Sequence, residues 1–332
     1  AMESRCIAVP RREAESVRQQ LLEQGLLRTD LEIWSDDEHV YLPVSEPVDI
    51  PRGEMLHREF EERLRPPDLQ DLLAGLLPED TSLSSFDVIG DIAIVRISDE
   101  ALPYRRDIGE AILETHSSIN VVCHDRGVKD EYRVRDVEVI AGEQRTETTH
   151  VEYGAEITVD VATVYYSPRL ATERKRVADQ VQPGEMVIDM FAGAAPFSVL
   201  IARLAHPSKV YAVDINAEAI AYARRNVQQN NVTDIVEVLH GDAAEMVPRL
   251  GPADHVIMNL PHSADAFFPL AVHAGRIIHY YDIVDAAGID DRLDWLVDAA
   301  AREGKTALIQ RWRQVGTYSP VQIKIGVDVA IS

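Results

Sequence analysis

The chain has 332 residues, of which 46% are hydrophobic, and its formal net charge is −23. This length exceeds a single ordinary core and predicts two or three domains, and no run approaches the roughly 20 apolar residues of a membrane helix. The negative charge disfavours a general nucleic-acid binder, because phosphates are repelled over most of such a surface, but it allows a local basic site.

A small N-terminal α/β domain is predicted for residues 1–50. Its expected elements are a helix at 13–23 and strands at 6–9, 31–34 and 39–42. The sequence then becomes charged and contains several prolines, so we assign residues 51–67 to a linker.

A middle α+β domain is predicted for residues 68–157. Its expected elements are a helix at 107–114 and strands at 86–97, 119–123 and 132–140. The periodicity of this block is less regular than that of the block that follows.

The last block, residues 158–332, alternates apolar strand-like runs with helical stretches. The expected strands lie at 186–190, 210–215, 236–239, 255–260 and 276–281, with helices at 217–229 and 264–274 between some of them. This alternation predicts a parallel, doubly wound sheet. Two final strands, 306–311 and 321–330, have no helix between them, so they predict a hairpin with one antiparallel strand. Together these features predict a Rossmann-like, seven-stranded, mostly parallel sheet of the class I methyltransferase type.

Three successive strands of this block end in residues suited to a nucleoside ligand. The first leads into the small-residue loop Phe191-Ala192-Gly193, where backbone can approach a ligand closely. The second ends at Asp214, whose carboxylate can accept both ribose hydroxyls. The third ends at Asp242, where an acid can accept an adenine amino group. The loop lacks the G-x-G-x-x-G pattern of NAD sites, so we favour S-adenosylmethionine, which carries no phosphates.

The fourth strand ends in Asn259-Leu260-Pro261. In amino-methylating class I enzymes an Asn-x-Pro segment stands beside the transferable methyl group and orients a planar nitrogen for attack. The alternative interpretation is an ordinary turn after a strand. The full set of expected cofactor-binding residues is Phe191, Ala192, Gly193, Asp214, Ile215, Asp242, Ala243, Asn259 and Pro261.

A basic segment precedes this domain. Residues 164–176 carry four basic groups and one acid in an otherwise acidic protein, together with two tyrosines that offer stacking surfaces. A contact with RNA phosphates and bases is therefore expected, although such a segment is also typical of a solvated helix start. The expected RNA-binding residues are Arg135, Arg145, Arg169, Arg174, Lys175 and Arg176.

The segments YYSPRLATER, DMFAGAAPFS, AVDIN and MNLP, together with EYRVRDVEVIAGE, resemble the archaeal and eukaryotic tRNA (guanine-37-N1)-methyltransferase family. The resemblance covers residues 68–332 well, and the N-terminal domain fits the family in size and pattern. It implies that Glu173 is the general base for the guanine N1 proton and that Arg133 stabilises charge on O6. It also implies that Tyr165 helps to place the base and that Asn259 holds its edge.

One position departs from the family pattern. Ala195 stands where we expect a second glycine in the first loop, and alanine does not adopt a positive φ easily. This substitution bears on the geometry or the affinity of the cofactor site.

Three kinds of alternative stay open. The related wyosine-pathway enzymes move an aminocarboxypropyl group, or methylate a wyosine intermediate, with the same fold. A protein or small-molecule methyltransferase is a more distant alternative, because Asn-x-Pro also serves glutamine methylation. A tRNA-binding module with a vestigial cofactor pocket is the non-enzymatic alternative.

The expected cellular setting follows from the N-terminus and the cysteines. The first residues lack the apolar core of a signal peptide, so we expect a cytoplasmic protein. Cys6 and Cys123 lie far apart and match no metal spacing, which predicts reduced thiols and no metal site. Only five lysines occur, and an acidic, lysine-poor surface is compatible with a salt-rich cytoplasm. We expect a monomer that binds the anticodon stem-loop of tRNA and no membrane.

Overall fold

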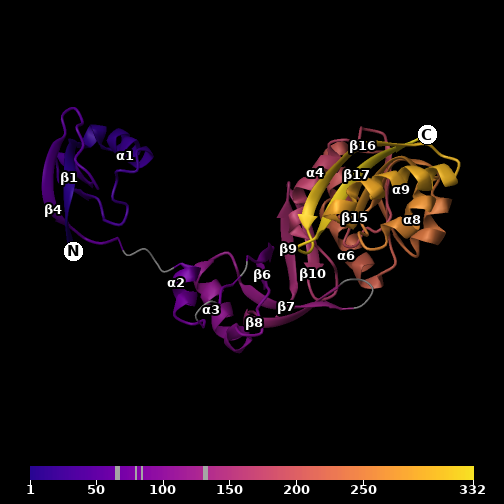
Figure 1. The fold of residues 1–332 in the computed structure, drawn as a ribbon, viewed down its shortest axis with the longest axis horizontal. Coiled ribbons are helices and arrows are strands. Elements are labelled where there is room, and N and C mark those ends of the chain that lie inside the picture. The colour runs from indigo at the N-terminus through magenta and orange to yellow at the C-terminus, as the bar shows by residue number, and fades with distance from the viewer. Residues whose placement is uncertain (64–67, 79–80, 84, 130–133) are drawn as a thin grey trace. The chain divides into compact units, whose positions relative to one another are not determined.

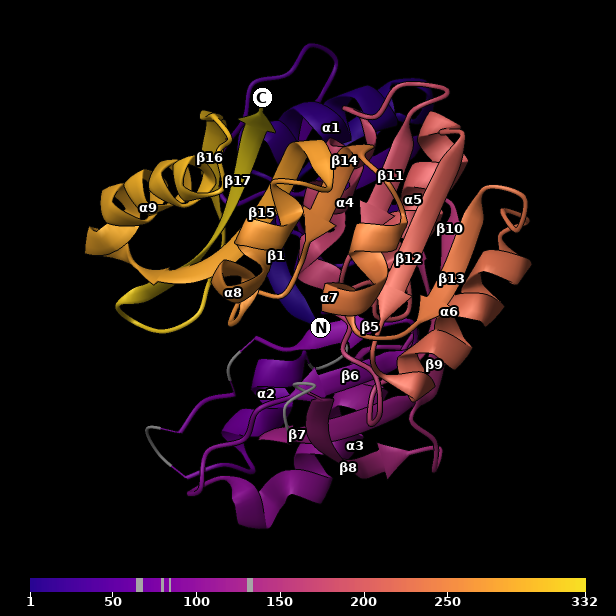
Figure 2. The ribbon, with the colours of Figure 1, turned by 90° about the vertical axis from the view of Figure 1, so that its right-hand side faces the viewer.

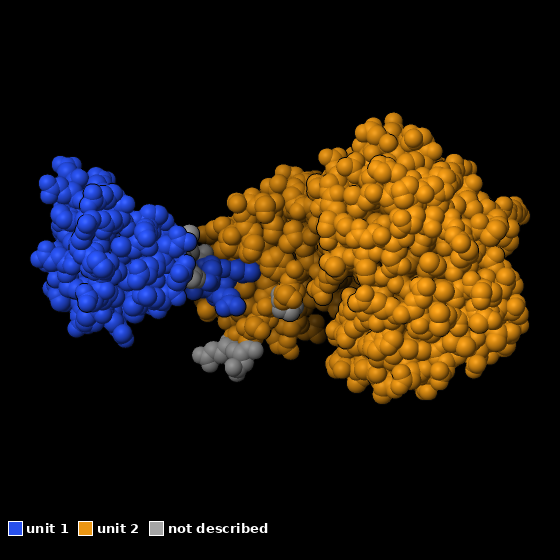
Figure 3. All heavy atoms as spheres, turned by 90° about the horizontal axis from the view of Figure 1, so that it is seen from above, with its two compact units in different colours: residues 1–71 blue, residues 72–332 orange. Residues whose placement is uncertain are grey.

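The computed structural model describes residues 1–63, 68–78, 81–83, 85–129 and 134–332. It divides into two compact units, residues 1–71 and 72–332, which Figure 3 distinguishes by colour. In the part of the chain that the structure describes, no helix is both long and apolar enough to span a membrane.

Unit 1 is an antiparallel sheet with one helix. Its strands have the order β2-β3-β1-β4, and their bounds are β1 Met2–Pro10, β2 Trp34–Ser35, β3 His39–Pro43 and β4 Glu54–Phe60. Helix α1, Ala14–Glu23, buries Val17 and Leu21 in a core with Ile7 and Leu42. Strand β4 lies inside the segment that we assigned to a linker, and it pairs with β1 along its whole length. The alternation of polar and apolar residues in this strand is obscured by its charged residues.

The first sheet of unit 2 has the order β5-β6-β7-β8. Its elements are α2 Leu69–Ala74, which crosses the unit boundary, β5 Asp87–Ile89, β6 Ile92–Val95, α3 Arg105–Thr115, β7 Val121–Lys129 and β8 Val134–Gly142. The single strand that we predicted for 86–97 is a hairpin. It turns at Gly90, where φ is +56° and a Cβ would overlap Thr148, so only glycine fits.

The large sheet of unit 2 has the order β13-β12-β11-β14-β15-β17-β16 (Figure 2). Its C-terminal strands β15, β16 and β17 are also labelled in Figure 1. Its strands are β11 Met186–Asp189, β12 Lys209–Asp214, β13 Val236–His240, β14 Ala253–Met258, β15 Gly275–Asp285, β16 Ala307–Thr317 and β17 Gln322–Ile331. Only β17 runs against the others, because it pairs antiparallel with both β15 and β16. This is the predicted seven-stranded class I methyltransferase sheet with its antiparallel C-terminal hairpin.

Two hydrophobic cores cover the two faces of this sheet. One contains residues of α4 Ala171–Ala178, α5 Pro196–Ala205 and α6 Ala217–Gln229, and the other contains residues of α7 Ala243–Met246, α8 Ala264–Ala271 and α9 Ile289–Arg302. Helix α9 was not among the predicted helices.

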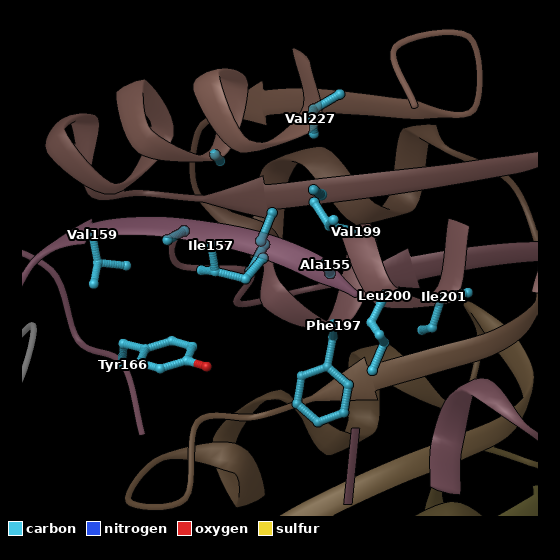
Figure 4. Close-up of a cluster of buried hydrophobic side chains, with 14 of the residues drawn as sticks. Ala155, Ile157, Val159, Tyr166, Phe197, Val199, Leu200, Ile201 and Val227 are labelled. Carbon is cyan, nitrogen blue, oxygen red and sulfur yellow. The ribbon is translucent and has the colours of Figure 1, made fainter. Parts of the chain in front are cut away.

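A further hairpin, β9 Glu147–Glu152 and β10 Ala155–Asp160, joins the first of these cores. Figure 4 shows Ile157 and Val159 of β10 in the same cluster as Phe197 of α5 and Val227 of α6. Residues 147–157, which we placed in the middle domain, therefore pack with the methyltransferase sheet.

Candidate active site

The loop between β11 and α5 forms one side of the site. Strand β11 ends at Asp189, and α5 begins at Pro196, which suits a first helical turn. Between them Gly193 and Ala195 have φ values of +57° and +65°, both in the left-handed region. For Ala195 this conformation costs roughly 1–2 kcal/mol, because its Cβ approaches a carbonyl oxygen. The alanine nevertheless makes the turn for which we expected glycine, and its side chain is fully buried.

Strand β12 brings Asp214 to the same edge of the sheet. Its Oδ2 accepts a hydrogen bond from the Gly193 N–H at 2.7 Å, and its Oδ1 accepts one from the Asn216 N–H at 2.8 Å. Burial raises the pKa of this carboxyl, and the hydrogen bonds act in the opposite direction. A carboxylate has about four acceptor positions, so room remains for two hydroxyl donors.

The other expected cofactor residues surround this pair. Asp242 is exposed and caps α7, with its Oδ1 accepting the Ala244 N–H at 2.8 Å. The Phe191 ring makes an edge contact with Phe267, at 4.9 Å between centroids. Ile215 is exposed beside Asp214, where a flat ring could pack on it. The strand ends thus bring together the residues that we predicted from three separate motifs.

Two buried oxygen atoms at this edge have no hydrogen-bond partner among the described residues: Asn259 Oδ1 and Asp189 Oδ1. Buried polar atoms are nearly always paired, so an unpaired one calls for an explanation such as a ligand. Asp189 accepts a hydrogen bond from the Ser198 hydroxyl through Oδ2 at 2.8 Å, and burial raises its pKa to about 7. We did not single out Asp189 from the sequence, although an acid that ends an apolar strand is a recognisable pattern.

The donor groups of S-adenosylmethionine match this set of acceptors. The cofactor carries two ribose hydroxyls, an adenine amino group and an ammonium group, all hydrogen-bond donors. The site presents carboxylates at Asp214 and Asp242 and the unpaired amide oxygen of Asn259. Among the described residues, no group of three His, Cys, Asp or Glu side chains could hold a metal ion.

A cleft of about 700 Å³ adjoins this edge. One wall comes from the first sheet of unit 2 and includes Ile94, Asp125 and Arg135, and the other comes from the methyltransferase domain. The methyltransferase wall contains the segment that follows β14, the segment before α4, and the end of β16. Its residues include Tyr165, Ser167, Arg169, Leu170, Asn259, Leu260, Pro261, His262 and the run 315–318.

Tyr165 links the cofactor loop to the cleft. A Cβ placed on Gly193 would lie 3.8 Å from the backbone oxygen of Tyr165, and the side chain of Tyr165 is 40% exposed at the cleft wall. The cleft also holds paired charges. Asp87 accepts hydrogen bonds from Arg135 at 3.2 Å and from Arg169 at 2.7 Å. Asn259, Tyr165 and these two arginines therefore line one cavity, a convergence that the sequence alone did not predict.

Glu173 is not among the described residues that line the cleft. Its side chain is buried, and its two oxygens accept hydrogen bonds from the Tyr281 hydroxyl at 2.6 Å, from Arg176 and from Arg313. Arg133, which we expect to stabilise O6, lies outside the described residues.

The remaining basic residues of the predicted RNA-binding set have other partners. Arg174 is 1% exposed and forms an ion pair with Glu152, so it has no surface for RNA and that prediction is wrong. The guanidinium of Arg176 is held between Glu173 and Asp328, and its side chain is 21% exposed, so a contact of Arg176 with RNA stays a prediction.

Arg145 and Lys175 are half-buried, and each forms an ion pair with a carboxylate. Arg145 pairs with Asp91 and with Glu143, and Lys175 pairs with Asp179 one helical turn later.

Family models match three consecutive parts of the chain. Residues 6–51 match the tRNA methyltransferase 5 N-terminal domain, residues 69–146 the TYW2 N-terminal domain, and residues 148–309 the TRM5/TYW2 methyltransferase domain. The boundary between the last two models lies at the start of β9.

Individual relatives cover nearly all of the chain. Trm5b of Pyrococcus abyssi, a tRNA (guanine(37)-N(1))-methyltransferase, is 38% identical over 98% of both chains. Its crystal structure matches with a TM-score of 0.83 over 99% of both chains, at 36% identity. The structure of aTrm5 in complex with tRNALeu matches with a TM-score of 0.75 over 98% of this chain and 99% of that one, at 31% identity.

A further relative covers less of the chain. Taw21 of Saccharolobus solfataricus, a tRNA 4-demethylwyosine(37)-methyltransferase, is 33% identical over 65% of this chain and 84% of its own. The full-length matches, the fold and the hydrogen-bond acceptors at the strand ends all indicate the same family. The chain belongs to the S-adenosylmethionine-dependent tRNA (guanine-37-N1)-methyltransferase family of archaea and eukaryotes.

Proposed function

We propose that this protein methylates N1 of guanosine 37 in tRNA, with S-adenosylmethionine as the methyl donor. The observation that carries the proposal is the position of Asn259, whose buried Oδ1 is unpaired among the described residues where the cofactor edge meets the cleft. An acceptor there can take a hydrogen bond from an amino group on the edge of a guanine. The bound cofactor supplies an electrophilic methyl group on its sulfonium centre.

Guanine N1 carries a proton at neutral pH, so it becomes a nucleophile only when a base removes that proton. The N1–H bond breaks, and its electrons stay on the base as an enolate-like anion. We assign the proton acceptor to Glu173 and the stabilisation of O6 to the guanidinium of Arg133. Tyr165 and Asn259 hold the ring in line with the methyl group.

The position of Glu173 adds a requirement to this mechanism. Its oxygens are saturated by Tyr281, Arg176 and Arg313, so they must exchange at least one of these partners before they can accept a proton from guanine. Leu170, one helical turn earlier, lines the cleft, and we propose that a change of the Glu173 side-chain rotamer brings its carboxylate toward the same cleft.

The wyosine-type methylation of Taw21 is the second candidate. That relative covers 65% of the chain, whereas Trm5b covers 98% and the N-terminal model matches residues 6–51. The longer match to Trm5b, together with the match of residues 6–51 to the N-terminal model, favours methylation of unmodified guanosine.

The test is mass mapping of tRNA after incubation with the enzyme and S-adenosylmethionine. We expect a gain of one methyl group at guanosine 37, and none when that nucleotide is adenosine. A gain of an aminocarboxypropyl group, or methylation only of wyosine-containing tRNA, would contradict the proposal.

Two variants separate the assigned roles. Glu173→Gln is expected to depress the single-turnover rate and to leave the cofactor dissociation constant nearly unchanged. Asp214→Ala should do the reverse and weaken cofactor binding, because it removes the acceptor for the ribose hydroxyls. An unchanged rate–pH profile for Glu173→Gln would remove Glu173 from the role of base.

A further inference from the structure

Glu173 is the centre of a buried cluster of charges below the cleft. Two guanidinium groups bind its carboxylate from opposite elements: Arg176 from the next turn of α4, with Nη2 at 2.8 Å from Oε1, and Arg313 from β16, with Nε at 2.8 Å from Oε2. The Tyr281 hydroxyl of β15 donates the remaining hydrogen bond. A base held by two cations is a weak proton acceptor, so the arrangement needs a way to loosen one of them.

Arg313 is the partner with an unused donor: its Nε and Nη2 both bind the Glu173 carboxylate, whereas its third nitrogen does not. Its Nη1 is buried and has no hydrogen-bond partner among the described residues, and it lies 3.7 Å from Asp328 Oδ1. Arg176, by contrast, donates to both oxygens of Asp328, at 2.7 and 3.0 Å. A small movement of the Arg313 guanidinium would therefore complete a hydrogen bond to Asp328.

Asp328 is anchored as an acceptor on the far side of the cluster. Burial raises its pKa, but hydrogen bonds from His279 and Arg176 outweigh that effect and hold the pKa far below its ordinary value. His279 in turn contacts His255 at 3.0 Å, and His255 contacts Glu185 at 3.0 Å. This row of side chains crosses the sheet through β17, β15 and β14, so Asp328 is a fixed, charged partner for Arg313.

The space that Arg313 occupies depends on a glycine. A Cβ on Gly326 would lie 2.9 Å from Arg313 Nη2 and 3.0 Å from a ring carbon of Tyr281. Gly326 has ordinary backbone angles, so the missing side chain serves to admit the guanidinium rather than to permit a turn.

The strand that carries Arg313 also forms part of the cleft wall. Residues 315–318 line the cleft, and the pairing of β16 with β17 shifts register between Gln314 and Gly316. This irregularity lies directly between Arg313 and the cleft wall. A ligand that presses on the wall can thus move Arg313 through two residues of irregular strand.

The geometry points to Arg313 as a positioning residue. Its guanidinium holds the Glu173 carboxylate out of the cleft, and when a nucleotide occupies the cleft the guanidinium leaves Glu173 and pairs with Asp328. This inference rests on the proposed function, because it takes Glu173 as the base. In the resting enzyme Arg313 pairs with Glu173. After the transfer Arg313 pairs with Asp328, and Glu173 is free to accept the guanine N1 proton.

The charges balance in both states. Counting the arginines and the acids, the resting cluster contains Arg176 and Arg313 against Glu173 and Asp328 and has no net charge. When the N1–H bond breaks and an O–H bond forms on Glu173, the cluster becomes singly positive and the guanine singly negative. The cluster thereby gains a charge opposite to that of the reacting base.

The first test is the pH dependence of single-turnover methylation at saturating tRNA and cofactor. Arg313→Gln removes a cation beside Glu173, so the acid limb of the rate–pH profile should move to higher pH, with a plateau no lower than that of the wild type. Arg311→Gln, an exposed change on the same strand, should leave the limb in place. An unmoved limb in Arg313→Gln, or a lower plateau, would overturn the inference.

The second test uses Asp328, the acceptor in the active state. Asp328→Asn should slow the plateau rate about tenfold, the equivalent of one hydrogen bond to a charged group, without changing either dissociation constant. In the double variant with Arg313→Gln this loss should disappear, because Glu173 no longer needs to be released. Additive losses would mean that Asp328 acts independently of Arg313.

A third variant displaces Arg313 without removing a charged side chain, so it tests the inference independently of the first two variants. Mapping of the product separates a failure of this inference from a failure of the proposed function. Gly326→Ala changes no charge but displaces the Arg313 guanidinium, so it should move the acid limb in the same direction as Arg313→Gln; an unmoved limb would count against the inference. The product nucleoside is mapped for every variant. If the wild type makes no 1-methylguanosine, the proposed function fails. If the wild type makes it and the acid limb of the rate–pH profile does not move in Arg313→Gln, only the role of Arg313 fails.

Discussion

Ala195 stores local strain in the loop that faces the cofactor. It has a φ of +65°, which costs alanine roughly 1–2 kcal/mol relative to glycine, while glycine costs more entropy on folding. Ala195→Gly should therefore raise the free energy of unfolding by about 0.5–1 kcal/mol, measured by urea denaturation without cofactor. Ala194→Gly is the matched control: Ala194 is equally buried and has no positive φ, so that change should lower stability.

Asp189 makes stability depend on pH near neutrality. Burial raises its pKa to about 7, so the folded protein binds a proton more tightly than the unfolded chain. The stability contributed by this group is present at acid pH and is lost as pH rises from about 4 through 7. Asp189→Asn should flatten that decline in a series of thermal melts, whereas Asp234→Asn, at an exposed position, should not. An equal slope in both variants would show that Asp189 is charged throughout.

At the scale of elements, Asn226 of α6 joins the β9–β10 hairpin to the cofactor loop. Its amide accepts the Thr158 N–H at 2.8 Å and donates to the carbonyls of Thr158 and Ala194 at 3.0 and 2.9 Å. Asn226→Ala leaves three buried backbone groups unpaired and should cost about 3–5 kcal/mol. Gln228→Ala, on the exposed side of the same helix, should cost less than about 0.5 kcal/mol.

Hydrophobic periodicity predicted the large sheet because its central strands, such as β11 and β14, are buried on both faces. Strands of mixed polarity were not found in this way. Strand β9 has one apolar residue among six, and β4 contains four charged or histidine residues among seven, so neither gave a strand pattern. Strand β10 does alternate apolar and polar residues, but without a recognisable partner strand it was not identified. The break at Gly90 was missed because apolar residues continue on both sides of the turn.

Local sequence likewise predicted one part of the site and not the other. Asp214, Asp242 and Asn259 follow strands, so their positions at one edge could be predicted from local sequence. The surroundings of Glu173 could not, because Tyr281 lies 108 residues away and Arg313 lies 140 residues away. Arg174 looked like part of a basic surface, yet its partner Glu152 lies on a hairpin that the sequence did not reveal.

At the scale of the whole molecule, a net charge of −23 makes RNA binding depend on few arginines. The cleft arginines Arg135 and Arg169 are already paired with Asp87, so a phosphate must compete with that carboxylate. Arg169→Gln should weaken tRNA binding and reduce the slope of log Kd against log salt by about 0.7–1, measured by filter binding.

The control for this measurement is Lys209→Gln. Lys209 begins β12, at the opposite end of the strand from Asp214, and should leave the slope unchanged. An equal effect of both changes would place the tRNA contact outside the cleft.

The attachment of the β9–β10 hairpin to α6 also has a consequence for synthesis of the chain. Thr158 is made 68 residues before Asn226, which corresponds to roughly 3–14 seconds at the usual speed of a ribosome. During that interval the apolar side chains of Ile157 and Val159 lack helix α6, and only α5 of the two helices that pack on β10 is available. The nascent methyltransferase domain therefore exposes apolar side chains of β10 near its N-terminal end. Conditions that slow translation before Asn226 lengthen the time in which this strand can aggregate or bind a chaperone.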